Sequence, residues 1–133
     1  MKILIVDDFV FVLERLKELI SVLWPSEIPV EVIAVQCLWA DAAIRAVEKY
    51  QPDFLLLDYS FRGDEKTGKD VALWIDRNYQ KPIHVATHSR RPENEARRLF
   101  SGAECVKHFI YGFLDTEHLK EFIESCTKQK GEN

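Results

Sequence analysis

Five short apolar runs alternate along the chain with five stretches that repeat apolar residues at helical spacing. Runs of this kind are typical of strands buried on both faces, and the stretches between them are typical of amphipathic helices. We predict strands at 2–6, 30–36, 54–57, 83–86 and about 104–109. We predict helices from Val12 to just before Pro25, from Trp39 to Tyr50, after Gly68, from Pro92, and from near Asp115.

The alternation of strands and helices with short connections predicts a parallel sheet with helices on both faces. Five such units favour a doubly wound, flavodoxin-like α/β fold with strand order 2-1-3-4-5 and five helices. The length of 133 residues fits one domain. We expect this domain to span residues 1–127, followed by a polar tail at 128–133.

Polar residues stand where three of the predicted strands end. Asp7 and Asp8 follow the first strand, Asp58 follows the third, and Thr87 follows the fourth. Each has a structural alternative, as a helix cap, a turn residue or an ordinary strand residue. The carboxyl ends of parallel strands meet at one edge of the sheet, so together these residues predict a site there. Lys107 is a candidate to join them.

Three carboxylates in one place repel one another unless a cation lies between them. Mg²⁺ suits such a site, because it prefers oxygen ligands and keeps positions free for water and phosphate. Asp7, Asp8, Asp58 and the backbone carbonyl of Ser60 are the predicted ligands. Asp58 lies on the central strand and is the best placed nucleophile toward phosphorus. The hydroxyl of Thr87 would then bond a phosphoryl oxygen.

The chain resembles the receiver domain of response regulators, the CheY-like superfamily of two-component signalling. The resemblance is carried by the Asp7-Asp8 pair, by Asp58 and Thr87, and by Thr67-Gly68 and Gly102-Ala103. It implies that Asp58 accepts a phosphoryl group, in the presence of Mg²⁺, from a sensor histidine kinase or a histidine phosphotransfer protein. Slow hydrolysis would reset this switch, which is not a turnover enzyme.

The resemblance also implies how the signal leaves the domain. A downstream protein target would bind the face formed by the fourth helix, the fifth strand and the fifth helix. A homodimer is left open. Phosphorylation would shift this face between two arrangements.

The sequence departs from the family's pattern at three places, the first of which is the segment 60–68, longer than the family's loop. Phe109-Ile110 stands where the family has a lysine followed by proline, and Lys107 comes two residues earlier. His88 replaces the small residue that usually follows the threonine. Ser60, His88 and Ser89 flank the predicted site and are candidate modulators of it. These departures favour an alternative function, a pseudo-receiver that binds a protein partner without being phosphorylated.

Other functions are less well supported by the sequence. A phosphatase with an aspartyl nucleophile would turn over phosphate esters, but Ser60 stands where such enzymes have a second aspartate. A transition-metal site formed by His88 and His108 is a further alternative, weighed below satisfied or exposed histidines. The arginines at 90, 91, 97 and 98 are interrupted by glutamates and predict a solvated or partner-facing surface.

Charge and composition narrow the class of protein. A net charge of -4 argues against a dedicated nucleic-acid binder. The start of the chain reaches Asp7 after four apolar residues, too few for a signal peptide or a membrane span. Three cysteines without CxxC spacing indicate reduced thiols. We therefore expect a cytoplasmic protein that binds neither membranes nor nucleic acid directly.

Overall fold

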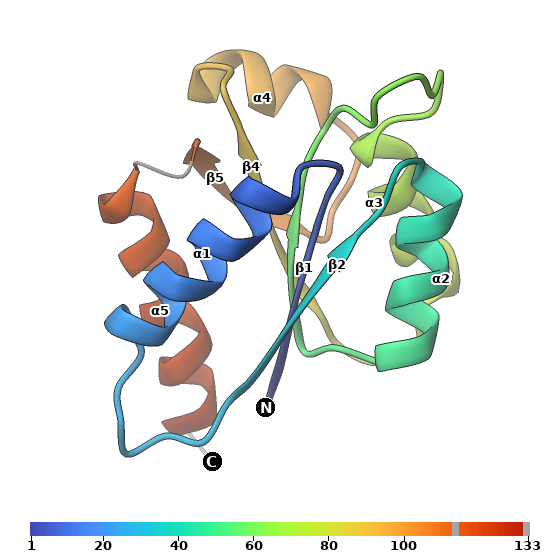
Figure 1. Cartoon of the computed structure of the whole chain (residues 1–133). Coiled ribbons are helices and arrows are strands. Elements are labelled where there is room, and N and C mark those ends of the chain that lie inside the picture. Colours follow the sequence, from blue (N-terminus) through green and yellow to red (C-terminus); the bar gives the residue numbers. More distant parts are fainter. Residues whose placement is uncertain (113–114, 132–133) are drawn as a thin grey trace.

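The computed structural model describes residues 1–112 and 115–131. Its sheet is parallel throughout, and its strands lie in the order β2-β1-β3-β4-β5 (Figure 1). The predicted flavodoxin-like order is thereby confirmed. The strands are β1 (Lys2–Asp7), β2 (Glu31–Gln36), β3 (Phe54–Leu57), β4 (His84–Ser89) and β5 (Val106–Tyr111). The helices are α1 (Val10–Leu23), α2 (Ala40–Tyr50), α3 (Gly68–Asn78), α4 (Glu93–Leu99) and α5 (Thr116–Gly131).

The largest differences from the predicted boundaries lie in the C-terminal half of the chain. β4 continues to Ser89, so Thr87 and His88 lie within the strand rather than after it. β5 starts at Val106, because residues before it form turns. α5 continues to Gly131, so the tail predicted from residue 128 begins inside this helix. Residues 132–133 of that tail lie outside the described part of the chain.

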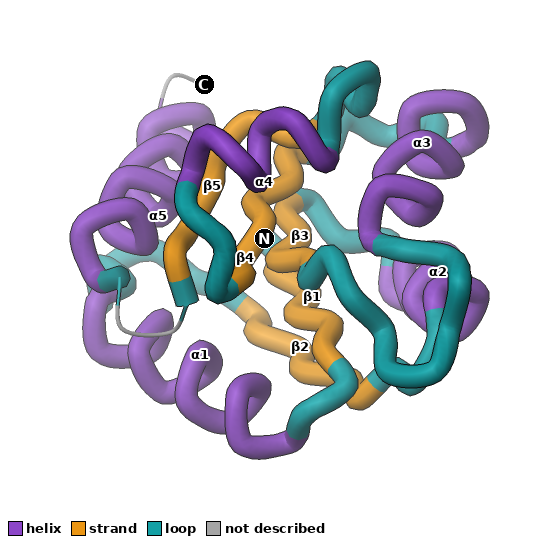
Figure 2. Tube along the Cα trace, turned by 90° about the horizontal axis from the view of Figure 1, so that it is seen from above, coloured by secondary structure: helices purple, strands orange, loops and turns teal. Residues whose placement is uncertain are grey.

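Helices cover both faces of the sheet and divide the core in two (Figure 2). Alternate strand residues such as Leu4, Leu55 and Val85 pack toward α2 and α3. The residues between them, such as Ile5, Leu56 and Ala86, pack toward α1 and α5. The parity of a strand position therefore decides which face its side chain occupies. This rule places the functional side chains described below.

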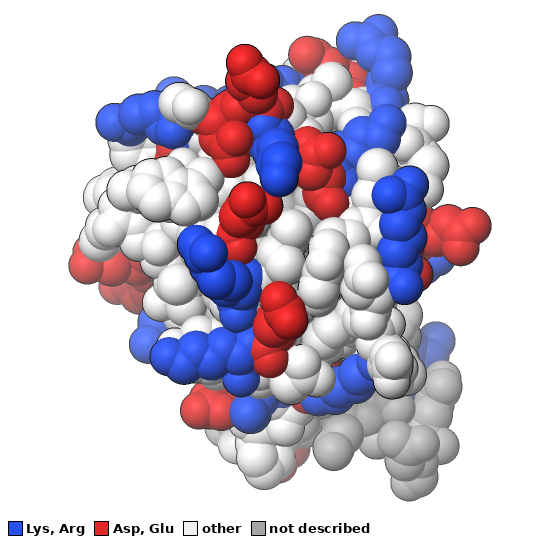
Figure 3. Space-filling view, turned by 90° about the vertical axis from the view of Figure 1, so that its right-hand side faces the viewer, with Lys and Arg blue, Asp and Glu red and all other residues white. Residues whose placement is uncertain are grey.

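The face that carries α2 and α3 presents acidic and basic side chains side by side (Figure 3). Such an interspersed surface does not form the basic stripe that attracts a nucleic-acid backbone. In the described part of the chain, no helix is long and apolar enough to cross a membrane.

Candidate functional site

Asp7, Asp58 and His88 come together at the carboxyl edge of the sheet. Each is two residues beyond a strand residue of the α1/α5 core, namely Ile5, Leu56 and Ala86, so all three side chains occupy that face. β1, β3 and β4 are adjacent in the sheet. One ligand atom from each of the three residues lies within 4.8 Å of the other two. The predicted convergence of Asp7 and Asp58 is confirmed, and His88 joins them.

Asp7 is buried and poorly compensated. Its side chain accepts a hydrogen bond of 2.7 Å from the backbone N–H of Phe9, which favours the charged form. Burial nevertheless raises the pKa of Asp7 to about 7, and the charges of Asp58 and Asp8 add to this effect. The carboxyl group is therefore only partly ionised near neutral pH. A bound cation would restore its charge.

Asp58 has a similar environment in the centre of the sheet. Burial raises its pKa to about 6, and the charge of Asp8 acts in the same direction. The backbone N–H of Tyr59 donates a hydrogen bond of 2.8 Å to Asp58 Oδ1 and partly opposes this rise. Two crowded carboxyl groups with raised pKa values are the donor set that a hard divalent cation neutralises. The residues present therefore fit Mg²⁺.

Asp8 lies beside this pair at a half-buried position of the same cavity. Its Oδ2 atom accepts a hydrogen bond of 3.0 Å from the backbone N–H of Arg62. Asp8 thereby attaches the loop that follows Asp58 to the end of β1. Asp7 is the buried carboxylate of the three, whereas Asp8 and Asp58 are half-buried.

The loop that follows Asp58 is held close to the site by α3. The N–H of Gly68 donates a hydrogen bond of 2.6 Å to the carbonyl of Tyr59. A Cβ atom at position 68 would overlap the backbone carbonyl oxygen of Asp58, so the sequence requires glycine there. Thr67 caps α3 and forms a reciprocal capping box with Asp70. The Thr67-Gly68 pair therefore fixes the backbone that carries Asp58.

The cavity beside these residues is an open cleft of about 410 Å³. Ser60 and Ser89 line it, as do the apolar side chains of Phe9 and Val12. Such a volume lies within the usual range of small-molecule sites and exceeds what a cation and one phosphoryl group require. The site has room for a larger phosphorylated group.

Thr87 does not line this cavity. It pairs with Leu57 on β3 and with Phe109 on β5, and it is only 1% exposed. Because Thr87 has the same parity as Val85, its side chain belongs to the opposite face of the sheet from His88. The prediction placed Thr87 at the end of β4, where it would have faced Asp58. The additional strand residues give that place to His88.

Lys107 is also absent from the residues that line the cavity. It is exposed on β5, beside the irregularity at which the pairing with β4 shifts between Val85 and Ala86. Burial lowers the pKa of His84, and the nearby charge of Lys107 lowers it further, which locates the ammonium group toward the opposite end of β4. Phe109 pairs with Thr87 instead, and its ring lies 4.6 Å below the guanidinium of Arg97. The predicted convergence of Lys107 is not confirmed.

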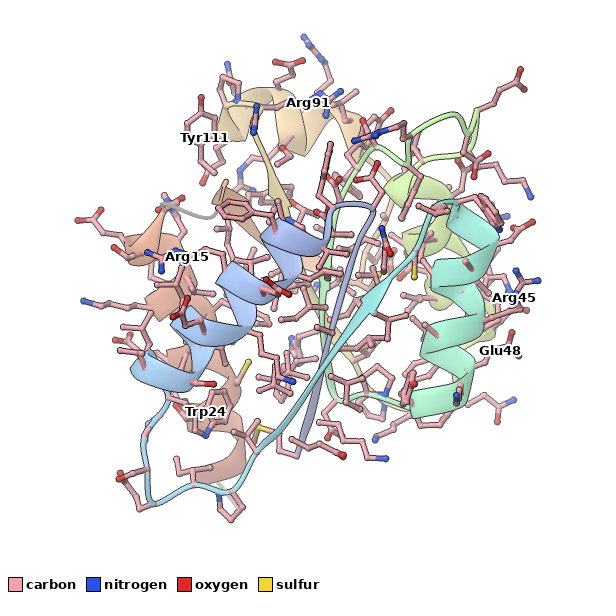
Figure 4. All side chains as sticks on the ribbon, in the orientation of Figure 1. Arg15, Trp24, Arg45, Glu48, Arg91 and Tyr111 are labelled. Atoms are coloured by element: carbon pink, nitrogen blue, oxygen red, sulfur yellow. The ribbon has the colours of Figure 1, made fainter. Side chains whose placement is uncertain are left out.

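Arginines supply the positive charge that was expected from lysine. Arg62, Arg90 and Arg91 line the cavity. Arg91 follows β4, and Figure 4 shows it where β4 meets α4. Its Nη2 atom donates a hydrogen bond of 3.4 Å to Ser60 Oγ, and its charge lowers the pKa of Asp58. The sequence predicts only a surface cluster for this residue, because the predicted strand ends at Ala86 and does not bring Arg91 to the site.

Arg91 also contacts α4 and the loop that follows Asp58. Its guanidinium lies 4.8 Å from the centre of the Tyr59 ring, and its Nε atom lies 3.8 Å from Glu95 Oε1. The backbone N–H of Arg91 donates a hydrogen bond of 3.2 Å to Ser89 Oγ. One side chain therefore links the cavity to α4.

His88 is 3% exposed, and its Nδ1 atom lies 3.5 Å from Asp7 Oδ2. Burial lowers its pKa to about 4, so the ring is neutral at pH 7. His108 does not join it, because its ring packs edge-on against Phe122 at 5.5 Å, beneath α5. The alternative of a site formed by His88 and His108 is therefore not supported.

The fold and the carboxylate geometry point to one protein family. Residues 2–101 match the family described as the cyclic-phosphate processing receiver domain. The chain belongs to this family. The matched segment of this receiver domain includes Asp7, Asp58 and His88. Membership supports a general phosphoacceptor role in two-component signalling. No curated protein matches the sequence.

Solved structures of response regulators share the fold of this receiver domain. NtrX from Brucella abortus matches with a TM-score of 0.68 and 19% identity, over 98% of this chain and 28% of that protein. The receiver domain of a putative LuxO repressor from Vibrio parahaemolyticus matches with a TM-score of 0.67 and 20% identity, over 98% and 94%. TrrA from Thermotoga maritima, solved in complex with Mg²⁺-BeF, matches with a TM-score of 0.71 and 19% identity, over 93% and 96%. These likenesses establish the fold alone.

Proposed function

We propose that this receiver domain accepts a phosphoryl group on Asp58 with the help of a divalent cation. The observation that carries the proposal is the position of Asp58, on the central strand and against the carboxylate of Asp7. Asp7, Asp8 and Asp58 would hold Mg²⁺, which neutralises the charge on the oxygens of the incoming group. Asp58 forms the new bond to phosphorus as the donor's bond breaks.

The donor that we propose is a phosphohistidine on a sensor histidine kinase or a histidine phosphotransfer protein. The domain then acts as a switch rather than as a turnover enzyme. The described cysteines are buried and free, which fits a reducing compartment, and we propose that the protein acts in the cytoplasm.

The output of the switch is proposed to pass through Arg91. A phosphoryl group on Asp58 would compete with Glu95 of α4 for the guanidinium of Arg91, which now lies between the cavity and that helix. The adjoining face of α4, β5 and α5 exposes Tyr111 and Arg97, residue types that are enriched where proteins bind one another. A downstream protein or a second copy of the chain would bind there.

The decisive experiment is phosphorylation with a small donor. The protein is incubated with acetyl phosphate and Mg²⁺, and its intact mass is measured over time. We expect the mass gain of one phosphoryl group in the wild type and in Asp41→Asn, an exposed carboxylate outside the site. We expect no gain in Asp58→Asn or when the cation is chelated. An unmodified wild type with this donor and with phosphoramidate would contradict the proposal.

A second function is favoured by the residues that replace the usual lysine and threonine. The cavity combines carboxylates with a histidine and three arginines, and the family is described as processing cyclic phosphates. Arginines bind the non-ester oxygens of a phosphodiester well, because their donors match its geometry. We propose, as the alternative, that the site opens a cyclic phosphate: water adds to phosphorus, one ring P–O bond breaks, and the departing oxygen takes a proton.

Phosphorus NMR distinguishes the two functions. The protein is incubated with a 2′,3′-cyclic nucleotide or a 3′,5′-cyclic nucleotide in the presence of Mg²⁺ or Mn²⁺. The alternative requires many equivalents of a phosphate monoester per protein, lost in Asp58→Asn and retained in Asp41→Asn. A stable mass gain with acetyl phosphate and no ring opening would instead support the switch.

A further inference from the structure

A buried histidine lies beside the carboxylates of the site. A site that binds only Mg²⁺ would need oxygen ligands alone. His88 contributes a ring nitrogen to the group in which the ligand atoms of Asp7, Asp58 and His88 all lie within 4.8 Å of one another. Neighbouring ligands of one octahedral ion are about 3.0 Å apart and opposite ligands about 4.2 Å, for bonds of about 2.1 Å. Small side-chain rotations would bring these three atoms onto a single ion.

The environment of the ring is incomplete without a ligand. His88 is 3% exposed, and its Nε2 atom has no hydrogen-bond partner, the one buried side-chain nitrogen or oxygen in the described residues for which this holds. An unsatisfied buried polar atom is destabilising, so a fold rarely retains one without use. His88 also lines the cavity that contains Asp7 and Asp58.

The ring of His88 also has a backbone partner. The carbonyl of Val6, on β1, accepts a hydrogen bond from the imidazole and favours a proton on it. Histidines that bind metals commonly direct their second ring nitrogen to a backbone carbonyl or a carboxylate, which fixes the tautomer. Val6 would orient the ring of a metal-bound His88 in this way.

We propose that Asp7, Asp58 and His88 form a binding site for a divalent first-row transition metal such as Mn²⁺, Fe²⁺, Co²⁺ or Zn²⁺. Imidazole nitrogen suits these ions, whereas Mg²⁺ prefers oxygen and keeps its waters. The inference concerns the same site as the proposed function and rests on it only for the presence of a cation.

The test measures metal binding directly, without turnover. Co²⁺ is titrated into the full chain while its visible d–d absorption is recorded, and Mg²⁺ binding is measured by calorimetry. We expect Co²⁺ to bind at least about tenfold more tightly than Mg²⁺. His88→Gln should weaken Co²⁺ binding by about tenfold or more and change Mg²⁺ binding by less than about twofold. His118→Gln, which removes an exposed histidine, should change neither.

Two results would overturn the inference. The first is equal loss of both metals in His88→Gln, and the second is unchanged Co²⁺ affinity in that variant. If His88→Gln does not fold, imidazole NMR of the wild type decides, because bound Co²⁺ must shift the ring signals of His88 before those of His118. Phosphorylation of Asp58 in the presence of Mg²⁺ is measured in a separate experiment. The proposed phosphorylation and the proposed transition-metal site can therefore fail independently of each other.

Discussion

The carboxylates at the two edges of the sheet have opposite environments. At the amino edge, Asp53 accepts a hydrogen bond of 2.8 Å from the N–H of Lys2 and lies 2.8 Å from Lys81 Nζ. At the carboxyl edge, Asp7 and Asp58 have raised pKa values. No lysine or arginine of the described residues lies within ion-pair distance of either carboxylate. One edge is satisfied by the chain itself, and the other is left ready for a ligand. The first edge contributes to stability, and the second is the one at which we propose that a cation binds.

Among the substitutions that test this difference between the two edges, a side chain added at Gly68 should have the largest effect. Gly68→Ala would force a methyl group into the backbone carbonyl of Asp58, so α3 and the loop that carries Asp58 must move apart. We expect a loss of about 3 kcal/mol in the free energy of unfolding, measured in urea, together with loss of phosphorylation. Gly63→Ala is the matched control: its positive φ of 78° is strained, but the space around it is open. It should cost about 1 kcal/mol.

Replacing Asp7 with a neutral residue should remove the free-energy cost of its buried charge. The pKa of Asp7 is about 7 in the folded protein and 3.8 in a model peptide, so the folded state holds the proton more strongly. Its contribution to stability is complete below about pH 4 and is lost as the pH rises through 7. Asp7→Asn, which keeps the acceptor for Phe9, should therefore stabilise the metal-free protein by about 2 kcal/mol at pH 8 and by almost nothing at pH 4.

Thermal unfolding at the two pH values, with and without cation, measures this effect. Added Mg²⁺ or Mn²⁺ should stabilise the wild type and leave Asp7→Asn unchanged, since ligand binding stabilises only a state that binds it. Asp41→Asn should behave as the wild type. If Asp7→Asn gains the same stability at pH 4 and at pH 8, the buried charge of Asp7 does not destabilise the wild type.

Arg91 tests whether arginine has replaced lysine at this edge. Removing the charge in Arg91→Gln should slow phosphorylation by acetyl phosphate about tenfold, because the guanidinium is the cation that lowers the pKa of Asp58. Arg91→Lys should recover part of the rate. Arg98→Gln, an exposed change on the following helix α4, should leave it unaltered. Equal rates in all variants would remove Arg91 from the site.

The sequence was sufficient for the half of the site formed by β1 and β3. Each strand contains one uninterrupted run of four apolar residues, so the aspartates that follow these runs could be located without ambiguity. Because the carboxyl ends of parallel strands meet at one edge, Asp7 and Asp58 could be predicted to lie together. The flavodoxin-like order followed from the number of strand–helix units and was confirmed.

The half formed by β4 and β5 could not be predicted in the same way. The polar side chains of Thr87, His88 and Ser89 predict that β4 ends at Ala86. These three residues are instead buried and continue the strand. A strand extended by these residues presents His88, rather than Thr87, beside Asp58. The shift of pairing between β4 and β5 moves Lys107 out of register, and such an irregularity leaves no periodic trace in sequence. Arg91 was hidden among neighbouring arginines of similar composition.

The smallest effect, and the one of opposite sign, should come from Asp53 at the amino edge. Burial raises the pKa of Asp53, but the hydrogen bonds from Lys81 and Lys2 outweigh it, and the pKa is lowered overall. Its contribution to stability is therefore present at neutral pH and is lost as the pH falls through the folded pKa. Asp53→Asn should cost about 1 kcal/mol at pH 7, because Asp53 is partly exposed, and less in acid. Urea unfolding at pH 7 and pH 3 measures both values. Asp53→Asn and Asp7→Asn should thus change stability in opposite directions above pH 7, which no general effect of losing one negative charge would produce.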